Sequence, residues 1–184
     1  MKTSDFKIVG LGASAGGLDA LKLFFRNLPV DPPAAYIVIM HLPVNYKTRL
    51  DQVLSGFTSL KVVLLEENSV LQPDTVYVLP GYLKVTLKDK VLMVQRRGIE
   101  PVNRVIDEFF FSLAEELGAH ATGVIFSGSG ADGASGMQAI HEKGGRVIVQ
   151  DPSTSQYSGM PDSAIRLDQP EVMKAESMGD SLQQ

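Results

Sequence analysis

The chain has 184 residues, which is enough for one domain with a substantial core. Its 44% hydrophobic and 21% charged residues are typical of a globular protein, and its net charge of −4 argues against a general nucleic-acid binder. The absence of cysteine excludes disulfides, thiolate catalysis and cysteine-ligated metals. Because the N-terminal MKTSDFK lacks the apolar core of a signal peptide and no apolar run is long enough to span a bilayer, we expect a cytoplasmic protein without membrane insertion.

The first part of the chain alternates short apolar runs with helical patterns. The predicted order is strand 6–10, helix 17–27, strand 35–40, helix 47–55 and strand 61–65. The stretch 75–95 differs, because Pro80-Gly81 and Lys88-Asp89-Lys90 divide it into three short runs. These runs predict short antiparallel strands joined by tight turns.

The second part of the chain returns to alternation. It predicts helix 103–117, strand 122–127, helix 134–143 and strand 146–149. The whole pattern indicates a doubly wound, three-layer α/β/α fold, with a mostly parallel sheet and a short antiparallel hairpin. We expect one domain over residues 1–167, followed by a polar tail or linker over residues 168–184.

A glycine-rich turn follows the first predicted strand. It reads GLGASAGG over residues 10–17, with Ser14 as its only hydroxyl. Such a turn can hold a phosphate on its backbone N–H groups and on the N-terminus of the following helix. It can equally present a serine as a nucleophile beside an oxyanion hole.

Three predicted parallel strands end in side chains that suit acid–base chemistry. Ser14, His41 and Asp132 each follow an apolar strand, and carboxyl ends of parallel strands meet at one edge of a sheet. A nucleophile, its base and an orienting carboxylate require these residue types. Each residue also has a structural explanation, as a helix cap, a strand end or a turn. The remaining histidines, His120 and His141, fit surface or capping roles better.

The competing interpretation is a nucleotide-binding, Rossmann-like module. Gly10, Gly12 and Gly16 form a variant of the dinucleotide fingerprint, which is a weak motif by itself. A dinucleotide site also needs an acidic residue at the end of the second strand, for the ribose hydroxyls. Met40-His41 occupies that place, so the turn is better explained as the site of a nucleophilic serine.

Several motifs together resemble the catalytic domain of the bacterial chemotaxis protein-glutamate methylesterases, the CheB type. They are GASAGG with Ser14, MHLP with His41, SGSGADGASG with Asp132, IDEFF at 106–110, and GRVIVQDPSTSQYSGMPDSAI at 145–165. The resemblance covers about residues 6–165 in order. It implies a serine hydrolase that removes methyl groups from glutamyl methyl esters of chemoreceptors, with glutamine deamidation as a second activity.

The resemblance also implies roles for individual residues. Ser14 is the expected nucleophile, His41 the general base and Asp132 the carboxylate that orients the imidazole. The backbone N–H groups of Ala15 and Ser129 are the expected oxyanion donors. Gly159 and Met160 are the expected substrate-binding residues, and no cofactor or metal is expected.

The same resemblance suggests binding partners and leaves an alternative function open. The expected substrate is the methylated cytoplasmic helices of chemoreceptors, or a similar methylated protein. The resemblance starts at the first strand, so we expect no phosphorylatable receiver domain in this chain. The stretch HLPVNYKTRL and the Gly-Met-Pro region resemble the forms that are fused to a methyltransferase domain. A catalytically silent sensory or docking domain of this fold is the alternative. Several basic residues could dock an acidic receptor helix or be simply solvated: Lys47, Arg49, Arg96, Arg97 and Arg104.

Overall fold

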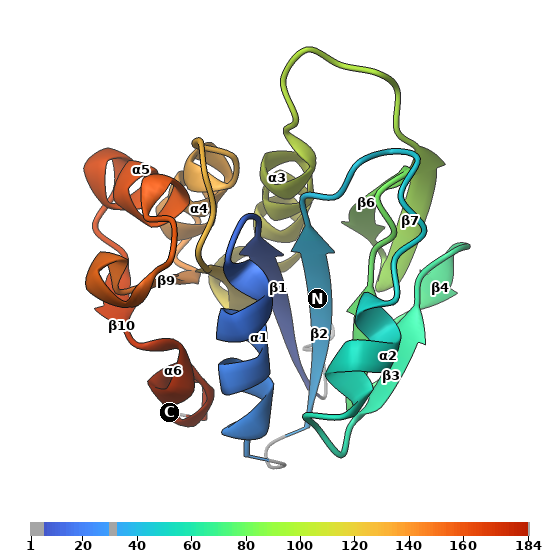
Figure 1. Cartoon of the computed structure of the whole chain (residues 1–184), viewed down its shortest axis with the longest axis horizontal. Coiled ribbons are helices and arrows are strands. Elements are labelled where there is room, and N and C mark those ends of the chain that lie inside the picture. Colours follow the sequence, from blue (N-terminus) through green and yellow to red (C-terminus); the bar gives the residue numbers. More distant parts are fainter. Residues whose placement is uncertain (1–5, 30–32, 184) are drawn as a thin grey trace.

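The protein is built around one parallel sheet with helices on both faces (Figure 1), seen in a computed structural model that describes residues 6–29 and 33–183. The sheet has the strand order β10-β9-β8-β1-β2-β5-β3, and every neighbouring pair is parallel. Its strands are β1 (Lys7–Ala13), β2 (Ala34–Met40), β3 (Lys61–Leu64), β5 (Thr75–Val78), β8 (Ala121–Ile125), β9 (Arg146–Gln150) and β10 (Glu171–Met173). The predicted three-layer α/β architecture is confirmed.

Two apolar clusters, one on each face of the sheet, hold the helices in place. One face carries α1 (Gly17–Arg26), α2 (Leu50–Ser55) and α6 (Ala175–Ser181). The other carries α3 (Val105–Leu117), α4 (Ala134–Glu142) and α5 (Gly159–Leu167). Two single-turn 3-10 helices span Gly118–His120 and Pro152–Thr154. Every helix among the described residues is too short or too polar to cross a membrane.

The apolar spacing of α1 explains how it docks. Leu21, Phe24 and Phe25 recur on one helical face and are almost completely buried. The ring of Phe24 meets Tyr36 of β2 and Phe126 at the end of β8 edge-to-face, at centroid distances of 5.9 and 5.6 Å. Burial of such rings stabilises the fold by about 1.5–3 kcal/mol each. It therefore anchors the helix that begins at the glycine-rich turn.

A second, smaller sheet packs against α3. It is antiparallel, with the order β4-β7-β6, and consists of β4 (Ser69–Val70), β6 (Leu83–Lys88) and β7 (Val91–Arg96). Asp89 and Lys90 join β6 to β7 with φ values of 50° and 62°, as the commonest two-residue hairpin turn requires. The prediction of three antiparallel strands over 75–95 is wrong for the first of them. Thr75–Val78 is buried along its whole length and lies between β2 and β3 in the parallel sheet.

The prediction of a polar tail from residue 168 onward is also wrong. β10 adds a parallel edge strand to β9, and α6 lies beside α1, where Ala175, Met178 and Leu182 are buried (Figure 1). The pattern is difficult to recognise in the sequence because β10 has only three residues and α6 buries one narrow stripe. The sheet and its helical layer therefore extend to the end of the described residues.

A bidentate ion pair joins the edge strand to its neighbour and gives a pH-dependent prediction. Arg146 Nε and Nη2 donate to Glu171 Oε1 and Oε2 at 2.7 and 2.8 Å. These hydrogen bonds hold the pKa of Glu171 below its ordinary value of 4.5. A lowered pKa stabilises the folded state above the unfolded-state value, and this stabilisation is lost as the pH falls through the folded-state value.

We therefore expect Glu171→Gln to lower the free energy of unfolding by about 0.2–1 kcal/mol at neutral pH, since the pair is partly exposed. The difference from wild type should shrink as the pH falls from neutral through the lowered pKa of Glu171. Urea unfolding at neutral pH and at an acidic pH below that pKa measures it. Glu115→Gln is the control, because Glu115 is more exposed and makes a single contact with Lys143. An equal difference at both pH values would contradict the assignment.

Candidate active site

The site lies where three neighbouring strands end, at the carboxyl edge of the sheet. β1 is flanked by β8 and β2, and the loops after these strands carry Ser14, Asp132 and His41. The β1–β2 register pairs Ala13 with Met40, and His41 N donates to Ala13 O at 3.0 Å. Ser14 and His41 directly follow this last register pair, so the two residues leave adjacent strands at the same level of the sheet.

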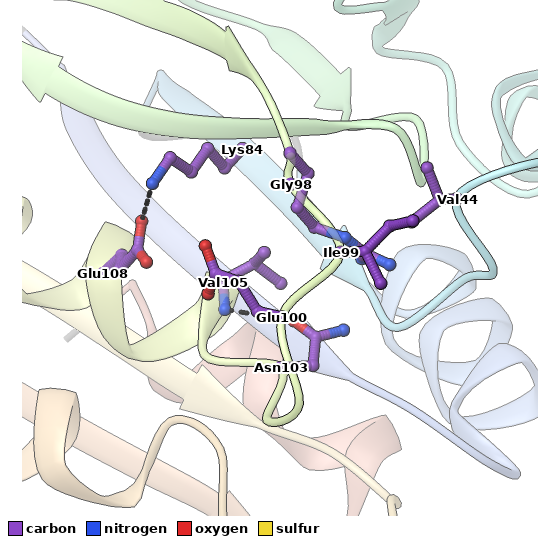
Figure 2. A pocket seen from close by; sticks show the side chains of 9 residues that line it. Val44, Lys84, Gly98, Ile99, Glu100, Asn103, Val105 and Glu108 are labelled. Carbon is purple, nitrogen blue, oxygen red and sulfur yellow. Dashed lines mark hydrogen bonds and ion pairs between the residues drawn. The ribbon is translucent and has the colours of Figure 1, made fainter.

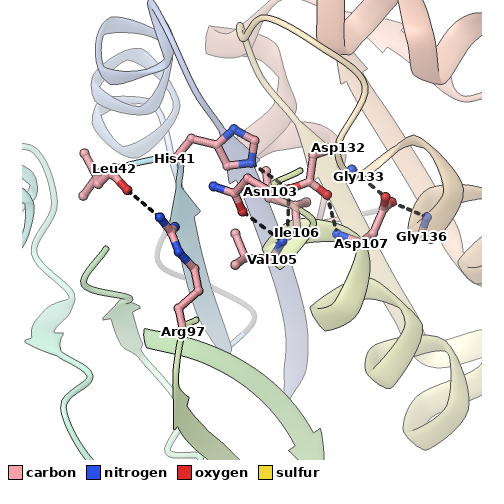
Figure 3. A network of polar contacts seen from close by, with 10 residues as sticks. All are labelled: His41, Leu42, Arg97, Asn103, Val105, Ile106, Asp107, Asp132, Gly133 and Gly136. Carbon is pink, nitrogen blue, oxygen red and sulfur yellow. Dashed lines mark hydrogen bonds and ion pairs between the residues drawn. The ribbon is translucent and has the colours of Figure 1, made fainter. Parts of the chain in front are cut away.

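His41 and Asp132 are in direct contact. The distance between His41 Nε2 and Asp132 Oδ2 is 2.6 Å, and the two side chains are 18% and 3% exposed (Figure 3). Asp132 Oδ2 also accepts from Ile106 N at 3.0 Å, and Oδ1 accepts from Asp107 N at 2.9 Å. These two N–H groups belong to the first turn of α3, where a carboxylate is electrostatically favoured. The carboxylate is therefore held in one orientation toward the imidazole.

This contact determines which ring nitrogen of His41 is available for proton transfer. Because Asp132 engages Nε2, Nδ1 is the nitrogen left to accept a proton. In the serine-protease arrangement the aspartate holds Nδ1 instead, so the two ring nitrogens exchange roles here. A serine served by this base would have to use Nδ1, the nitrogen opposite to the one that the carboxylate holds.

The glycine-rich turn brings Ser14 close to neighbouring backbone. Ser14 N donates to Ser127 O at 3.0 Å, and Gly17 N donates to Ser14 O at 2.9 Å. Gly16 has a φ of 71°, and a Cβ there would lie 2.7 Å from Gln156 Cβ. A Cβ on Gly128 would lie 2.8 Å from Ser14 Cβ. Glycine at these two positions allows the serine turn, the loop after β8 and the loop before α5 to meet.

Two buried polar residues that the sequence did not single out as functional brace this turn. Ser127 Oγ donates to Ala15 O at 2.9 Å and accepts from Tyr157 N at 3.0 Å. Gln150 Oε1 accepts from Ser127 N at 2.9 Å, and its Nε2 donates to Thr154 O at 3.1 Å. The available signal was their position, since each ends an apolar strand that points toward the same edge of the sheet.

The predicted oxyanion donors are exposed, whereas the predicted substrate-binding residues pack against the loop after β8. Ala15 and Ser129 are both exposed, and their backbone N–H groups donate to no acceptor within residues 6–29 and 33–183. Gly159 packs on the turn that contains Ser129, since a Cβ there would lie 3.0 Å from Gly130 N. Met160 is only 1% exposed. Its side chain lies in the core against Gly128 rather than in an open cleft.

A cleft of about 400 Å³ opens beside the His41–Asp132 pair. It is bordered by Ser129 and by the loop that leads into α3, whose residues 101–104 form one wall. Ser14 is not among the residues that line it, so the strand register is what links the serine to His41. Within the described part of the chain, no group of three or more histidines and carboxylates is placed to hold a metal ion.

A second pocket of about 210 Å³ adjoins the cleft and shares Asn103 with it (Figure 2). Lys84 Nζ and Glu108 Oε2 form an ion pair of 3.1 Å along its edge. Arg97, also in its lining, donates from Nη2 to Leu42 O at 3.3 Å (Figure 3). This hydrogen bond connects the small sheet to the segment directly after His41.

The other two histidines lie away from this site. His141 belongs to the last turn of α4, the opposite end of the helix from Asp132, and its Nδ1 lies 2.7 Å from Asp168 Oδ1. Its side chain is 51% exposed. His120 ends a 3-10 helix and is exposed. Both positions agree with the surface roles predicted for them.

Comparison with known proteins identifies the family. The family model described as CheB methylesterase matches residues 9–182. The chain is 34% identical over 163 residues to a protein-glutamate methylesterase/protein-glutamine glutaminase of Myxococcus xanthus, covering 86% of this chain and 47% of that protein. A protein of the same name from Burkholderia lata is 38% identical over 162 residues, covering 87% and 48%. The chain thus spans about half the length of these curated relatives.

A solved structure of the same domain type supports this family assignment. The crystal structure of the CheB methylesterase catalytic domain of Thermotoga maritima superposes with a TM-score of 0.85 at 28% identity. The match covers 97% of this chain and 98% of that one. Both sheets, the loops around His41 and the C-terminal strand and helix therefore belong to one known domain type. The chain belongs to the CheB methylesterase family.

Proposed function

We propose that this chain is a serine esterase domain that hydrolyses glutamyl methyl esters of chemoreceptors and releases methanol. The observation that carries the proposal is the 2.6 Å contact between His41 and Asp132, one strand away from Ser14. Membership of the CheB methylesterase family supports the same reaction. The names of the relatives add glutamine deamidation as a second activity.

In the proposed acylation step, Ser14 Oγ attacks the carbonyl carbon of the ester and His41 Nδ1 takes the hydroxyl proton. Asp132 stabilises the resulting imidazolium through Nε2–H. The C–O bond to the methoxy group then breaks, and His41 returns the proton to the departing oxygen. Methanol leaves, and the glutamyl carbonyl remains bound to Ser14 as an ester.

In the proposed deacylation step, water attacks this acyl-enzyme and gives its proton to His41. The bond to Ser14 Oγ breaks, the serine regains a proton, and the glutamate carboxylate is released. A glutamine side chain follows the same path with ammonia in place of methanol. The same three residues therefore account for both activities.

The negative charge that develops on the carbonyl oxygen needs hydrogen-bond donors that are already in place. Ala15 N–H is suited to this role because it follows the nucleophile at the N-terminus of α1. Ser129 N–H, on the edge of the cleft, is the proposed second donor. Both are backbone groups, so the serine side chain at position 129 does not enter the chemistry.

Two loops beside the cleft suit an acidic substrate in the cytoplasm. Residues 41–49 and 96–104 carry five lysines or arginines and one glutamate, in a chain of net charge −4. They also expose apolar side chains: Tyr46 (54%), Ile99 (99%) and Val102 (60%). A methylated receptor helix with further glutamates on its surface would meet complementary charge here. We propose these loops as the contact for the chemoreceptor, or for a similar methylated protein.

This proposal predicts an effect on substrate binding. The double variant Lys47→Glu/Arg96→Glu should raise KM for methylated receptor by about tenfold and leave kcat within about twofold, since exposed charges act mainly on encounter and docking. Added salt should raise the KM of wild type more than that of the variant. Lys88→Glu, at the exposed far end of β6, is the matched control. A kcat effect without a KM effect would contradict the docking role.

A fluorophosphonate probe tests the proposed function directly. It labels a serine only when the hydroxyl is activated, so we expect stoichiometric labelling at Ser14, located by mass spectrometry of the digested protein. A folded chain that is not labelled would support the alternative of a silent sensory or docking domain. Saturable binding of NAD or ATP by calorimetry, without labelling, would instead favour the nucleotide-binding alternative.

A further inference from the structure

A second buried carboxylate adjoins the site and has no part in the mechanism above. Asp107 lies in the first turn of α3 and is 7% exposed. Its Oδ1 accepts from Gly133 N at 3.0 Å and from Gly136 N at 2.8 Å. Gly133 is the N-cap residue of α4 and has no side chain, so the cap of α4 comes from another helix.

The hydrogen bonds of Asp132 run in the opposite direction. Asp132 precedes α4, and its carboxylate accepts from the N–H groups of Ile106 and Asp107 at the start of α3. The N-terminus of each helix is therefore capped by an aspartate from the start of the other helix or from the loop directly before it (Figure 3). A closed ring results, in which Asp107 holds Gly133 through its side chain and Asp132 through its backbone N–H.

In this ring Asp132 is the one residue that contacts both Asp107 and His41. Gly133, with a φ of 93°, directly follows Asp132, and its N–H donates to the Asp107 carboxylate. If that anchor is lost, the start of α4 loses two hydrogen bonds to α3, and Asp132 keeps only those from Ile106 N and Asp107 N, so its loop can shift relative to His41. A displacement of about 1 Å in a catalytic group can reduce a rate by about 100-fold.

We propose, on the basis of the proposed function, that Asp107 is a positioning residue that keeps the Asp132 carboxylate in register with His41. It touches neither the substrate nor the reacting atoms. The role is distinct from simple helix capping, because it predicts a change at the imidazole as well as a change in stability.

The electrostatics show that the arrangement is costly. Burial raises the pKa of Asp107, and the nearby charge of Asp132 adds to the rise, while the N–H groups of Gly136 and Gly133 and the Arg104 charge lower it. Two carboxylates side by side are unfavourable unless each is compensated. Here each carboxylate faces the N-terminus of a helix, which supplies donors and favourable charge.

The test compares Asp107→Ala with Asp107→Asn. Alanine removes the acceptor for both N–H groups, so fluorophosphonate labelling of Ser14 and kcat should fall about 10- to 100-fold, with KM nearly unchanged. The asparagine amide oxygen can accept the same two N–H groups, so Asp107→Asn should recover to within about threefold of wild type. The NMR signal of the His41 Nε2 proton should be retained in Asp107→Asn and lost or shifted in Asp107→Ala.

Ser112→Ala is the matched control, because it also removes two hydrogen bonds from α3. Its hydroxyl accepts from Leu87 N at 2.9 Å and donates to Phe109 O at 2.7 Å, and neither bond involves Asp132. Labelling of Asp107→Ala at the rate of Ser112→Ala, or an unchanged His41 signal, would overturn the positioning role. A failure of wild type to be labelled would overturn the proposed function instead. The NMR comparison tests Asp107 in either case, since it needs no turnover.

Discussion

Replacing Ser14 by alanine is expected to lower kcat for methylated receptor by about 10⁴- to 10⁶-fold, the range seen when a serine nucleophile is removed. The thermal midpoint should stay close to that of wild type. The reason is that Ser14 holds its turn through backbone atoms, N to Ser127 O and O from Gly17 N, and alanine keeps both bonds. Methanol release and the melting curve measure the two quantities.

The matched control is Ser55→Ala, since Ser55 is an exposed hydroxyl on α2 that donates to Gln52 O. It should keep full activity. Retained methanol release in Ser14→Ala would contradict the nucleophile assignment. A collapse of the midpoint together with the activity would instead mean that the side chain supports the fold.

The second large effect is expected for Asp132→Asn. Three donors converge on this side chain: the N–H groups of Ile106 and Asp107, and His41 Nε2. An amide has only one oxygen, so at least one donor meets an NH₂ group. In either orientation of the amide the imidazole loses the negative charge that stabilises its protonated form, and kcat should fall about 10⁴-fold. The free energy of unfolding should fall by about 1–3 kcal/mol, the usual cost of a buried group without a partner.

The chain offers a matched control for this variant. His141 and Asp168 form a second histidine–aspartate pair, at 2.7 Å, on the far end of α4. Asp168→Asn should leave kcat unchanged, because that pair does not reach the cleft. Equal losses of activity in the two variants would indicate a general effect on stability rather than a role for Asp132 at His41. Denaturant unfolding beside steady-state kinetics separates the two explanations.

The elements that the sequence predicted well are those with a strong local pattern. Continuous apolar runs such as AYIVIM predicted buried parallel strands, and the spacing of Leu21, Phe24 and Phe25 predicted a helix with one apolar face. Thr75–Val78 was misassigned, because its four residues do not reveal which strands they join. The C-terminal strand and helix were missed because they bury too few residues to produce a period.

In the site, too, the residues with a strong local pattern were predicted and those without one were not. Strand ends rich in glycine and polar residues pointed to Ser14, His41 and Asp132, and parallel topology required them to share an edge of the sheet. Met160 was predicted to contact substrate, but the structure buries it behind Gly128. The position of Asp107 in a motif gave no reason to link it to Asp132, which lies 25 residues away.

The sequence by itself determined the fold class, the order of most elements and the identity of the residues at three strand ends, because these follow from hydrophobic period and turn chemistry. Only the tertiary structure decided which nitrogen of His41 meets Asp132, how Asp107 and Asp132 cap each other's helices, and where the last strand pairs. The reason is physical. These features are contacts between segments far apart in the chain, and their energies depend on distances and orientations that only the packed helices and sheet establish.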